Sequence, residues 1–203
     1  MGISDCISEI LTIIRQTKDP GLGYSKLLDL CSRSEESPLW KKLPTVNVSR
    51  DVADSVLWLE KELGQKRRAS ATGIYLGLDT LNMSGDDGHN VEIGGSDGAD
   101  PTSESLDWAY GCGWYGDHYL IRGLREMHSV YAQPEEKDLF AFADYILFLG
   151  YSGLVLASAV ENMNPEIRSG PKGRLFGWGF HDGDLFPLCR AIGERVERLA
   201  TDE

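Results

Sequence analysis

The sequence predicts an α+β fold in which N-terminal helices pack on a mixed or mainly antiparallel sheet that further helices flank. Residues 1–64 repeat apolar side chains at helical spacing, and short β-branched and aromatic runs bounded by glycine then follow. Helical spacing returns after residue 117. With 203 residues and 41% hydrophobic content, the chain is long enough for one ordinary core. We expect an N-terminal helical segment at 1–64 and an α+β part at 72–203, joined in one globular unit.

Three helices are predicted in the N-terminal segment. The first covers 3–16 and ends at "DPGLG", because proline and glycine interrupt helices. The second covers 24–33. The third covers 50–64, with Ser49 as N-cap and Gly64 at its end. The apolar side chains that set the spacing of these helices are Ile3, Ile7, Ile10, Leu11, Ile14, Leu27, Leu28, Leu30, Val52, Val56, Leu59 and Leu63.

The second part begins with a predicted hairpin. "TGIYLGL" at 72–78 and "NVEIGG" at 90–95 have strand composition, and "NMSGDDGH" between them is rich in turn residues. "GRLFGWGF" at 173–180 predicts a further strand, which the turn "HDGD" ends.

Further helices are predicted at 117–132, from Pro134 onward, and at 187–200 as a last amphipathic helix. The stretch 139–160 contains a single charge, Asp144, and is long enough to cross a bilayer. Gly150 and Gly153 divide this stretch, so we predict a pair of buried helices, or one helix with a glycine break, rather than a membrane span.

The four cysteines indicate a reducing compartment. Cys6, Cys31, Cys112 and Cys189 are far apart and form no CxxC or Cys/His cluster. Cys6 and Cys31 lie on apolar helix faces and are predicted to be small core residues. The first residues lack the basic region of a secretory signal. We therefore expect a cytoplasmic protein.

The charge is strongly acidic and unevenly placed. The formal net charge is -12, from 32 acids and 20 bases. Between Arg68 and Arg122 there is no lysine or arginine, whereas this interval contains nine acids. This charge argues against direct nucleic-acid binding, because a phosphate backbone requires a basic face. The nine acids are Asp79, Asp86, Asp87, Glu92, Asp97, Asp100, Glu104, Asp107 and Asp117.

Catalytic and metal-binding motifs are weak. "GDDGHN" and "GGSDGAD" do not have EF-hand spacing, and no phosphate-binding glycine motif follows a strand. We expect no cofactor, no metal and no catalytic residue. The competing hypothesis is a metal-dependent hydrolase in which Asp182 and Asp184 orient His181 or bind a metal with it. In the non-catalytic interpretation, "HDGD" is a tight turn that leaves a strand.

Capture of a basic protein explains the acidic interval better. An acidic surface accelerates encounter with a cationic protein, and buried aromatic anchors supply affinity. Aromatic residues follow the acids directly, although a single aromatic ring is more often part of a core. The predicted binding residues are Asp97, Asp100, Glu104, Asp107, Trp108, Trp114, Tyr115 and Asp117, and Asp182 and Asp184 extend the surface. An adaptor for another basic protein would use the same surface.

Three blocks in this order resemble bacterial immunity proteins of toxin–immunity systems, including those paired with type VI secretion effectors. The blocks are "GIYLGLDTLN", "VEIGGSDGADPTSESLDWA" and "GWGFHDGDLFPL". The resemblance covers about residues 72–190. The matching positions are Gly95-Ser96-Asp97, Asp107-Trp108, Leu149-Gly150-Tyr151, Gly179-Phe180 and Gly183-Asp184.

The resemblance implies a cytoplasmic antidote that binds a cognate toxin and blocks its active site or substrate entry. Immunity families have no catalytic residues, and their toxin-binding surfaces vary, so the binding residues above come from charge and aromatic content alone. The acidic surface favours a basic toxin. A nuclease, such as a DNase, is the expected partner, because it must itself attract phosphate.

Overall fold

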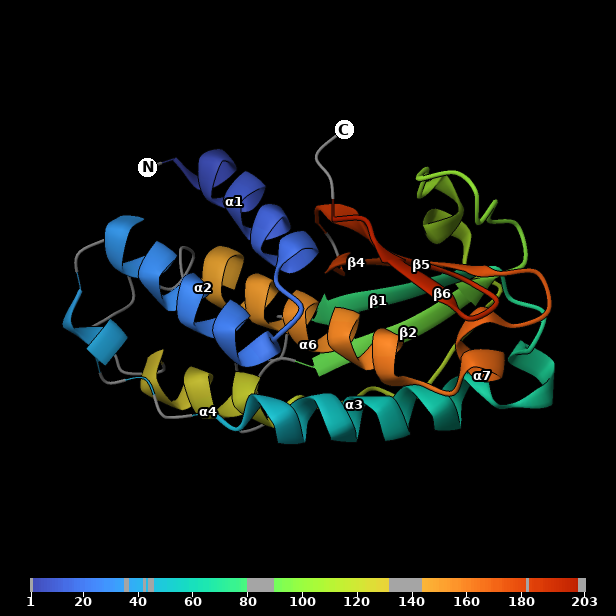
Figure 1. Cartoon of the computed structure of the whole chain (residues 1–203), viewed down its shortest axis with the longest axis horizontal. Coiled ribbons are helices and arrows are strands. Elements are labelled where there is room, and N and C mark those ends of the chain that lie inside the picture. The colour runs from blue at the N-terminus through green and yellow to red at the C-terminus, as the bar shows by residue number, and fades with distance from the viewer. Residues whose placement is uncertain are drawn as a thin grey trace.

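A computed structural model shows one mixed sheet with helices packed on it (Figure 1), which confirms the predicted fold class. It describes residues 2–34, 37–41, 43, 46–79, 90–131, 144–181 and 183–200. Within these residues, six strands form a sheet in the order β3-β2-β1-β4-β5-β6. β1 and β4 are parallel, and the other neighbouring pairs are antiparallel. The strands are β1 (Gly73–Asp79), β2 (Asn90–Ser96), β3 (Trp114–Tyr115), β4 (Arg174–Phe180), β5 (Leu185–Ile192) and β6 (Arg195–Arg198).

Most of the helices correspond to predicted ones with shifted ends, whereas the helix at 165–169 was not predicted. They are α1 (Ile3–Gln16), α2 (Pro20–Ser34), α3 (Val48–Leu63), α4 (Arg122–Tyr131), α6 (Leu149–Asn162) and α7 (Pro165–Ser169). α2 begins at Pro20, inside the predicted break. The N-cap of α3 is Asn47, whose side chain accepts from the Arg50 N–H at 3.0 Å, so the prediction of Ser49 is wrong. Shorter turns are η1 (Pro38–Lys41), η2 (Lys66–Arg68), η3 (Asp107–Gly111) and the π-helix η5 (Asp144–Phe148).

α4 begins later than predicted because residues before it pair with the sheet. Trp114 and Tyr115 form β3 against β2, and Tyr119 forms an isolated bridge with Val91. The predicted hairpin is confirmed, since β1 and β2 pair in antiparallel register from Gly73↔Ser96 to Asp79↔Asn90. Its loop, and the helix predicted from Pro134, lie largely outside the described residues.

The predicted C-terminal helix at 187–200 is wrong, because this segment forms β5 and β6. Gly193 has a φ of 59° and turns the chain between the two strands. The apolar residues Leu188, Ala191 and Val196 also fit helical spacing, so periodicity alone favoured the wrong element. Pairing with β4 decides the conformation, because it satisfies the backbone groups of β5.

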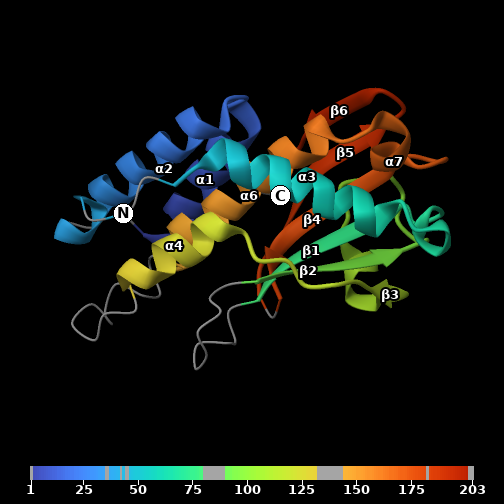
Figure 2. The ribbon, with the colours of Figure 1, turned by 90° about the horizontal axis from the view of Figure 1, so that it is seen from below.

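α6 is the centre of the fold, between the sheet and the other helices (Figures 1 and 2). Every residue from Leu149 to Val160 is buried. Gly150 and Gly153 do not break the helix. Instead, a Cβ at Gly150 would lie 2.7 Å from a Leu27 methyl, and one at Gly153 would lie 2.6 Å from an Ile14 methyl. The two glycines therefore let neighbouring helices approach closely. No helix in the described part of the chain is long and apolar enough to cross a membrane.

One hydrophobic cluster joins the N-terminal helices to the sheet. Cys6, Cys31 and Cys189 are buried in this cluster, as predicted for Cys6 and Cys31. All four cysteines are among the described residues and are free thiols. Burial raises the pKa of Cys31 and of Cys189 to about 12, so both remain protonated and inert at neutral pH.

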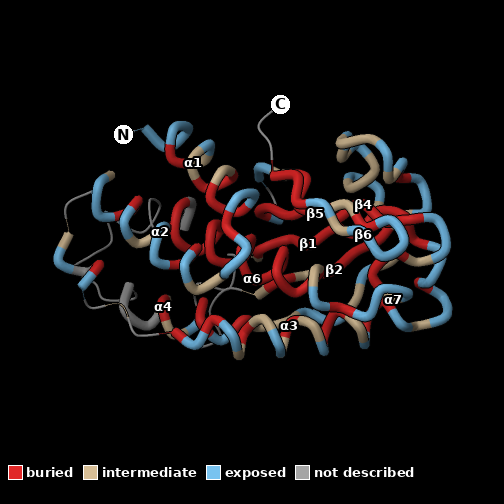
Figure 3. Tube along the Cα trace, in the orientation of Figure 1, coloured by how far each residue is buried: buried red, intermediate tan, exposed pale blue. Residues whose placement is uncertain are grey.

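The two faces of the sheet differ. Ile74, Leu76 and Leu78 belong to the cluster under the helices, whereas the alternate residues Gly73, Tyr75 and Gly77 point to the opposite face. In Figure 3 the traces of α6, β1 and β4 are mostly buried, whereas the segment that follows β2 is mostly intermediate or exposed. This segment contains most of the predicted binding residues.

Candidate functional site

The predicted binding residues are concentrated in the acidic segment, defined here as residues 97–115. This segment leaves β2, crosses the sheet face opposite α6, forms η3 and returns to the sheet edge as β3 (Figures 1 and 2). The backbone N–H of Gly113 donates to the carbonyl of Gly95 at 2.8 Å, and β3 pairs with Gly94 and Gly95. Both ends of the segment are therefore fixed to β2.

Two glycines of the sheet, Gly73 and Gly177, leave room for side chains of the acidic segment, and we call them the glycine seat. A Cβ added at Gly73 would lie 2.5 Å from Cε3 of Trp108, and one at Gly177 would lie 3.0 Å from Cδ2 of Leu106. Trp108 and Leu106 therefore lie directly on the backbone of β1 and β4. This role could not be predicted, because glycines inside strands usually indicate a bulge or a weak strand.

Three carboxylates of the acidic segment, Asp97, Asp100 and Asp107, are exposed. Asp97 accepts a hydrogen bond from Ser70 Oγ at 3.2 Å, and Asp107 accepts one from Ser105 Oγ at 3.0 Å. None of the three forms an ion pair within the part of the chain that the structure describes. Their negative charge is therefore available to a cationic partner.

Local hydrogen bonds also keep Asp100 ionised. Its Oδ1 accepts from Thr102 Oγ1 at 2.7 Å and from the Thr102 N–H at 2.9 Å. The side-chain bond, followed by the backbone bond, lowers the pKa of Asp100 below its ordinary value. Asp100 thus keeps its charge under mildly acidic conditions.

Two other predicted acids already have cationic partners. Glu104 is half-buried, and its carboxylate lies 3.7 Å from Arg190 on β5. Asp117 lies beyond β3, where its carboxylate is 3.1 Å from Lys61 Nζ of α3. The structure therefore separates these two acids from the unpaired group of Asp97, Asp100 and Asp107.

Asp184 does not join that group either. It lies in the turn between β4 and β5, where its carbonyl accepts from the N–H of Phe180. Phe180 pairs with Leu78, whereas Asp97 follows Ser96, which pairs with Gly73. Five residues along β1 correspond to about 17 Å, so Asp184 is at the other end of the strands. Asp182 lies outside the described residues.

Two of the aromatic rings are half-buried and two are exposed. Trp108 is half-buried, and its Nε1 donates to the carbonyl of Ser105 at 3.0 Å. Trp114 is half-buried beneath the Arg68 guanidinium, whose carbon lies 4.5 Å from the ring centroid. Tyr115 is 53% exposed and Tyr110 is 88% exposed. The two tyrosines are therefore the rings that a partner can reach.

Tyr110 was absent from the predicted binding residues. Its exposure could be inferred only from its spacing in "DWAYG", because a 3₁₀-helix such as η3 has three residues per turn. With Trp108 facing the sheet, a residue two positions later faces another direction. That inference requires the orientation of Trp108, which the sequence does not supply.

A hollow of about 670 Å³ lies beside β3. The Trp114 and Tyr115 rings line it together with Asp97, and Arg67 is also in its wall. Its backbone lining is mostly glycine, from Gly95, Gly98, Gly111 and Gly113. A long side chain from a partner would fit here, with one carboxylate and two rings to contact.

A second polar cluster lies around Glu92 on β2. Its carboxylate is 2.9 Å from Nδ1 of His181 and 3.6 Å from Nε2 of His118. His181, the centre of the competing hydrolase hypothesis, therefore contacts Glu92. Among the described residues, no three His, Cys, Asp or Glu side chains are arranged to bind a metal ion. Asp182, the second member of the hypothesis, lies outside those residues.

Comparison of this chain with protein-family models, curated proteins and solved structures found no significant match.

Proposed function

We propose that this chain is an immunity-type inhibitor that binds a basic protein toxin through the acidic segment. The observation that carries the proposal is the group of three exposed carboxylates, Asp97, Asp100 and Asp107, without ion pairs in the described structure. Tyr110 and Tyr115 are exposed in the same segment. Exposed acids beside exposed aromatic rings are suited to a cationic protein surface.

The acids and the rings would contribute to different steps of binding. Exposed charges mainly raise the rate of encounter, and their effect falls as salt screens them. Large aromatic rings that become buried mainly slow dissociation. Because both ends of the segment are hydrogen-bonded to β2, little conformational entropy is lost when a partner binds.

A nuclease toxin is the partner class that this chemistry favours. An enzyme that acts on nucleic acid presents cations to the phosphate backbone. Carboxylates on a fixed segment can occupy the same cations and thereby block substrate entry. The toxin identity of the partner depends on the resemblance to immunity proteins, and the preference for a cationic surface depends on the exposed acids.

The first test measures association with the toxin encoded next to this chain. The triple variant Asp97→Asn, Asp100→Asn, Asp107→Asn keeps an acceptor oxygen for each local turn and removes three charges. We expect association to slow about tenfold or more at low salt and the salt dependence to flatten. Asp29→Asn, Glu166→Gln, Glu194→Gln removes three exposed acids from other elements and should change the rate less than about twofold.

The second test measures protection. Cells that produce the toxin should grow when the wild-type chain is present, and Tyr110→Ala with Tyr115→Ala should weaken protection through faster dissociation. A neighbouring protein that this chain neither binds nor inhibits contradicts the toxin assignment. Equal association rates for the two triple variants contradict the assignment of the acidic segment as the binding surface.

A further inference from the structure

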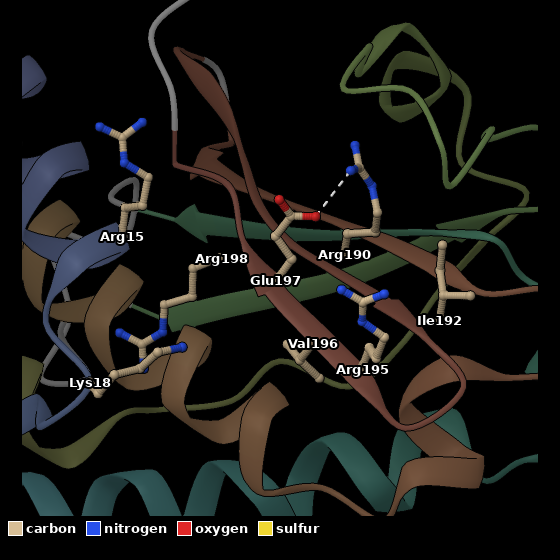
Figure 4. A pocket seen from close by; sticks show the side chains of 8 residues that line it. All are labelled: Arg15, Lys18, Arg190, Ile192, Arg195, Val196, Glu197 and Arg198. Atoms are coloured by element: carbon tan, nitrogen blue, oxygen red, sulfur yellow. Dashed lines mark hydrogen bonds and ion pairs between the residues drawn. The ribbon is translucent and has the colours of Figure 1, made fainter.

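A cationic pocket of about 610 Å³ lies at the β6 edge of the sheet (Figure 4). It is formed where the end of α1 meets the hairpin of β5 and β6. A volume of this size is typical of small-molecule sites. The lining residues are Arg15, Lys18, Arg190, Ile192, Arg195, Val196, Glu197 and Arg198.

Arg198 has a structural function. Its side chain is 1% exposed, and its guanidinium donates to the carbonyls of Ile14 at 2.8 Å and Thr17 at 2.6 Å. It also contacts Glu161 at 2.6 Å, and Glu161 contacts Lys18 at 2.5 Å. These bonds satisfy carbonyls at the C-terminal end of α1, which would otherwise repel an anion in the pocket.

Arg190 is also neutralised within the protein. Its guanidinium donates to Glu197 at 3.2 Å, the contact marked in Figure 4, and lies 3.7 Å from Glu104. The lining therefore has five cations, and three carboxylates contact them: Glu104, Glu161 and Glu197. Three of the five cations, Lys18, Arg190 and Arg198, therefore already contact carboxylates.

The remaining two cations of the lining are Arg15 and Arg195. Both are exposed, and neither has a hydrogen bond or an ion pair with any residue that the structure describes. Arg15 is in the last turn of α1, where the helix dipole alone gives a cation a modest stabilisation. Arg195 begins a short edge strand and has no such role. Two unpaired guanidinium groups in one pocket of a chain with net charge -12 indicate an anionic ligand.

We propose that this pocket binds a small molecule that carries a di- or triphosphate group. Guanidinium groups bind phosphate oxygens through paired N–H donors, so Arg15 and Arg195 would each engage a phosphoryl group. Lys18 is 69% exposed at the rim and supplies a further donor. Ile192, which is 45% exposed, and Val196 offer an apolar wall for the nucleoside of a nucleotide. This site is independent of the proposed toxin binding.

Isothermal titration calorimetry with pyrophosphate, ATP and adenosine tests the site in about 0.15 M salt. The variant is Arg15→Gln with Arg195→Gln, and both residues are exposed, so folding should be unaffected. We expect the affinity for pyrophosphate and ATP to fall about tenfold or more. The control, Arg67→Gln with Arg122→Gln, removes two exposed cations from η2 and α4, and should retain wild-type affinity.

The three probes also distinguish the ligand source. Equal affinities for pyrophosphate and ATP assign the site to the phosphate chain alone. Tighter binding of ATP than of pyrophosphate, with weak binding of adenosine, assigns it to a nucleotide. The proposal is overturned if neither phosphate binds with a Kd below about 1 mM, or if the control loses as much affinity as the variant.

Discussion

At the scale of single residues, a buried carboxylate connects three helices. Asp51 of α3 is fully buried and accepts from the N–H of Gly123 at 2.7 Å and the hydroxyl of Tyr151 at 2.8 Å. Arg50 donates to its other oxygen at 2.9 Å. Burial, followed by the charge of Asp51, raises the pKa of Tyr151 far above its ordinary value. The phenol therefore remains a donor throughout the pH range in which the protein is folded.

Asp51→Ala should strongly destabilise the protein. It leaves the Tyr151 hydroxyl and the Gly123 N–H buried without an acceptor, and we expect the free energy of unfolding to fall by about 3 kcal/mol or more. Asp54→Ala is the control, because Asp54 is 35% exposed and lies 3.7 Å from Arg122. Its loss should be below about 1 kcal/mol in urea denaturation. Similar losses for both variants would contradict this account of Asp51.

Glu161 makes stability depend on pH. Burial alone would raise the pKa of Glu161, but hydrogen bonds from Arg198 and Lys18, with their charges, outweigh burial and lower it below the ordinary 4.5. A folded-state pKa below the unfolded value stabilises the fold above about pH 4.5, and this contribution is lost as the pH falls through the folded-state pKa.

Glu161→Gln tests this dependence. The wild-type protein should exceed the variant in free energy of unfolding most clearly above pH 4.5, and the difference should shrink steadily as the solution is acidified further. Chemical denaturation at several pH values provides the measurement. A constant difference across that range would show that the ion pairs of Glu161 are not the cause.

At the scale of elements, the glycine seat holds the acidic segment on the sheet. Gly73→Ala should displace Trp108, because the new Cβ would lie 2.5 Å from its ring and 2.8 Å from the Ala99 Cβ. We expect a loss of about 1–3 kcal/mol in unfolding free energy and a shifted Trp108 indole N–H resonance. Gly111→Ala is the matched control, since nothing lies within 4 Å of its added Cβ. An unshifted Trp108 resonance in Gly73→Ala would contradict the contact between Trp108 and the backbone of Gly73.

The elements differ in how well the sequence predicts them. The strands around "GIYLGL" and "VEIGG" were predictable because their composition and the turn residues between them agree. The C-terminal strands were not, since Leu188, Ala191 and Val196 fit helical spacing and pairing with β4 decided the outcome. Likewise, Gly150 and Gly153 predicted a break in α6, whereas in the fold they are points of close helix packing.

At the scale of the whole molecule, the acidic segment reaches the cationic pocket, because Glu104 lies 3.7 Å from Arg190, which lines the pocket at β5 and β6. The acidic segment was visible in the sequence because its acids are close together along the chain. The cationic pocket was not, because it combines Arg15 and Lys18 of the N-terminal region with residues 190–198. A site assembled from distant segments has no sequence signature until the fold is known.

This proximity predicts how the sites influence each other. The acidic segment crosses the sheet face and comes close to the pocket, because Glu104 lies 3.7 Å from Arg190 and the charge of Arg190 contributes to the lowered pKa of Asp100. The Debye length is about 8 Å at 0.15 M salt and about 30 Å at 0.01 M. The triple variant Asp97→Asn, Asp100→Asn, Asp107→Asn should therefore raise the pyrophosphate affinity of the pocket by a smaller factor at 0.15 M than at 0.01 M. At 0.01 M the same variant should bind pyrophosphate more tightly than wild type, because three repelling charges are gone. Calorimetry at the two salt concentrations decides the matter: an equal effect at both would mean that the acids contact the ligand or reshape the pocket, rather than act through the long-range field.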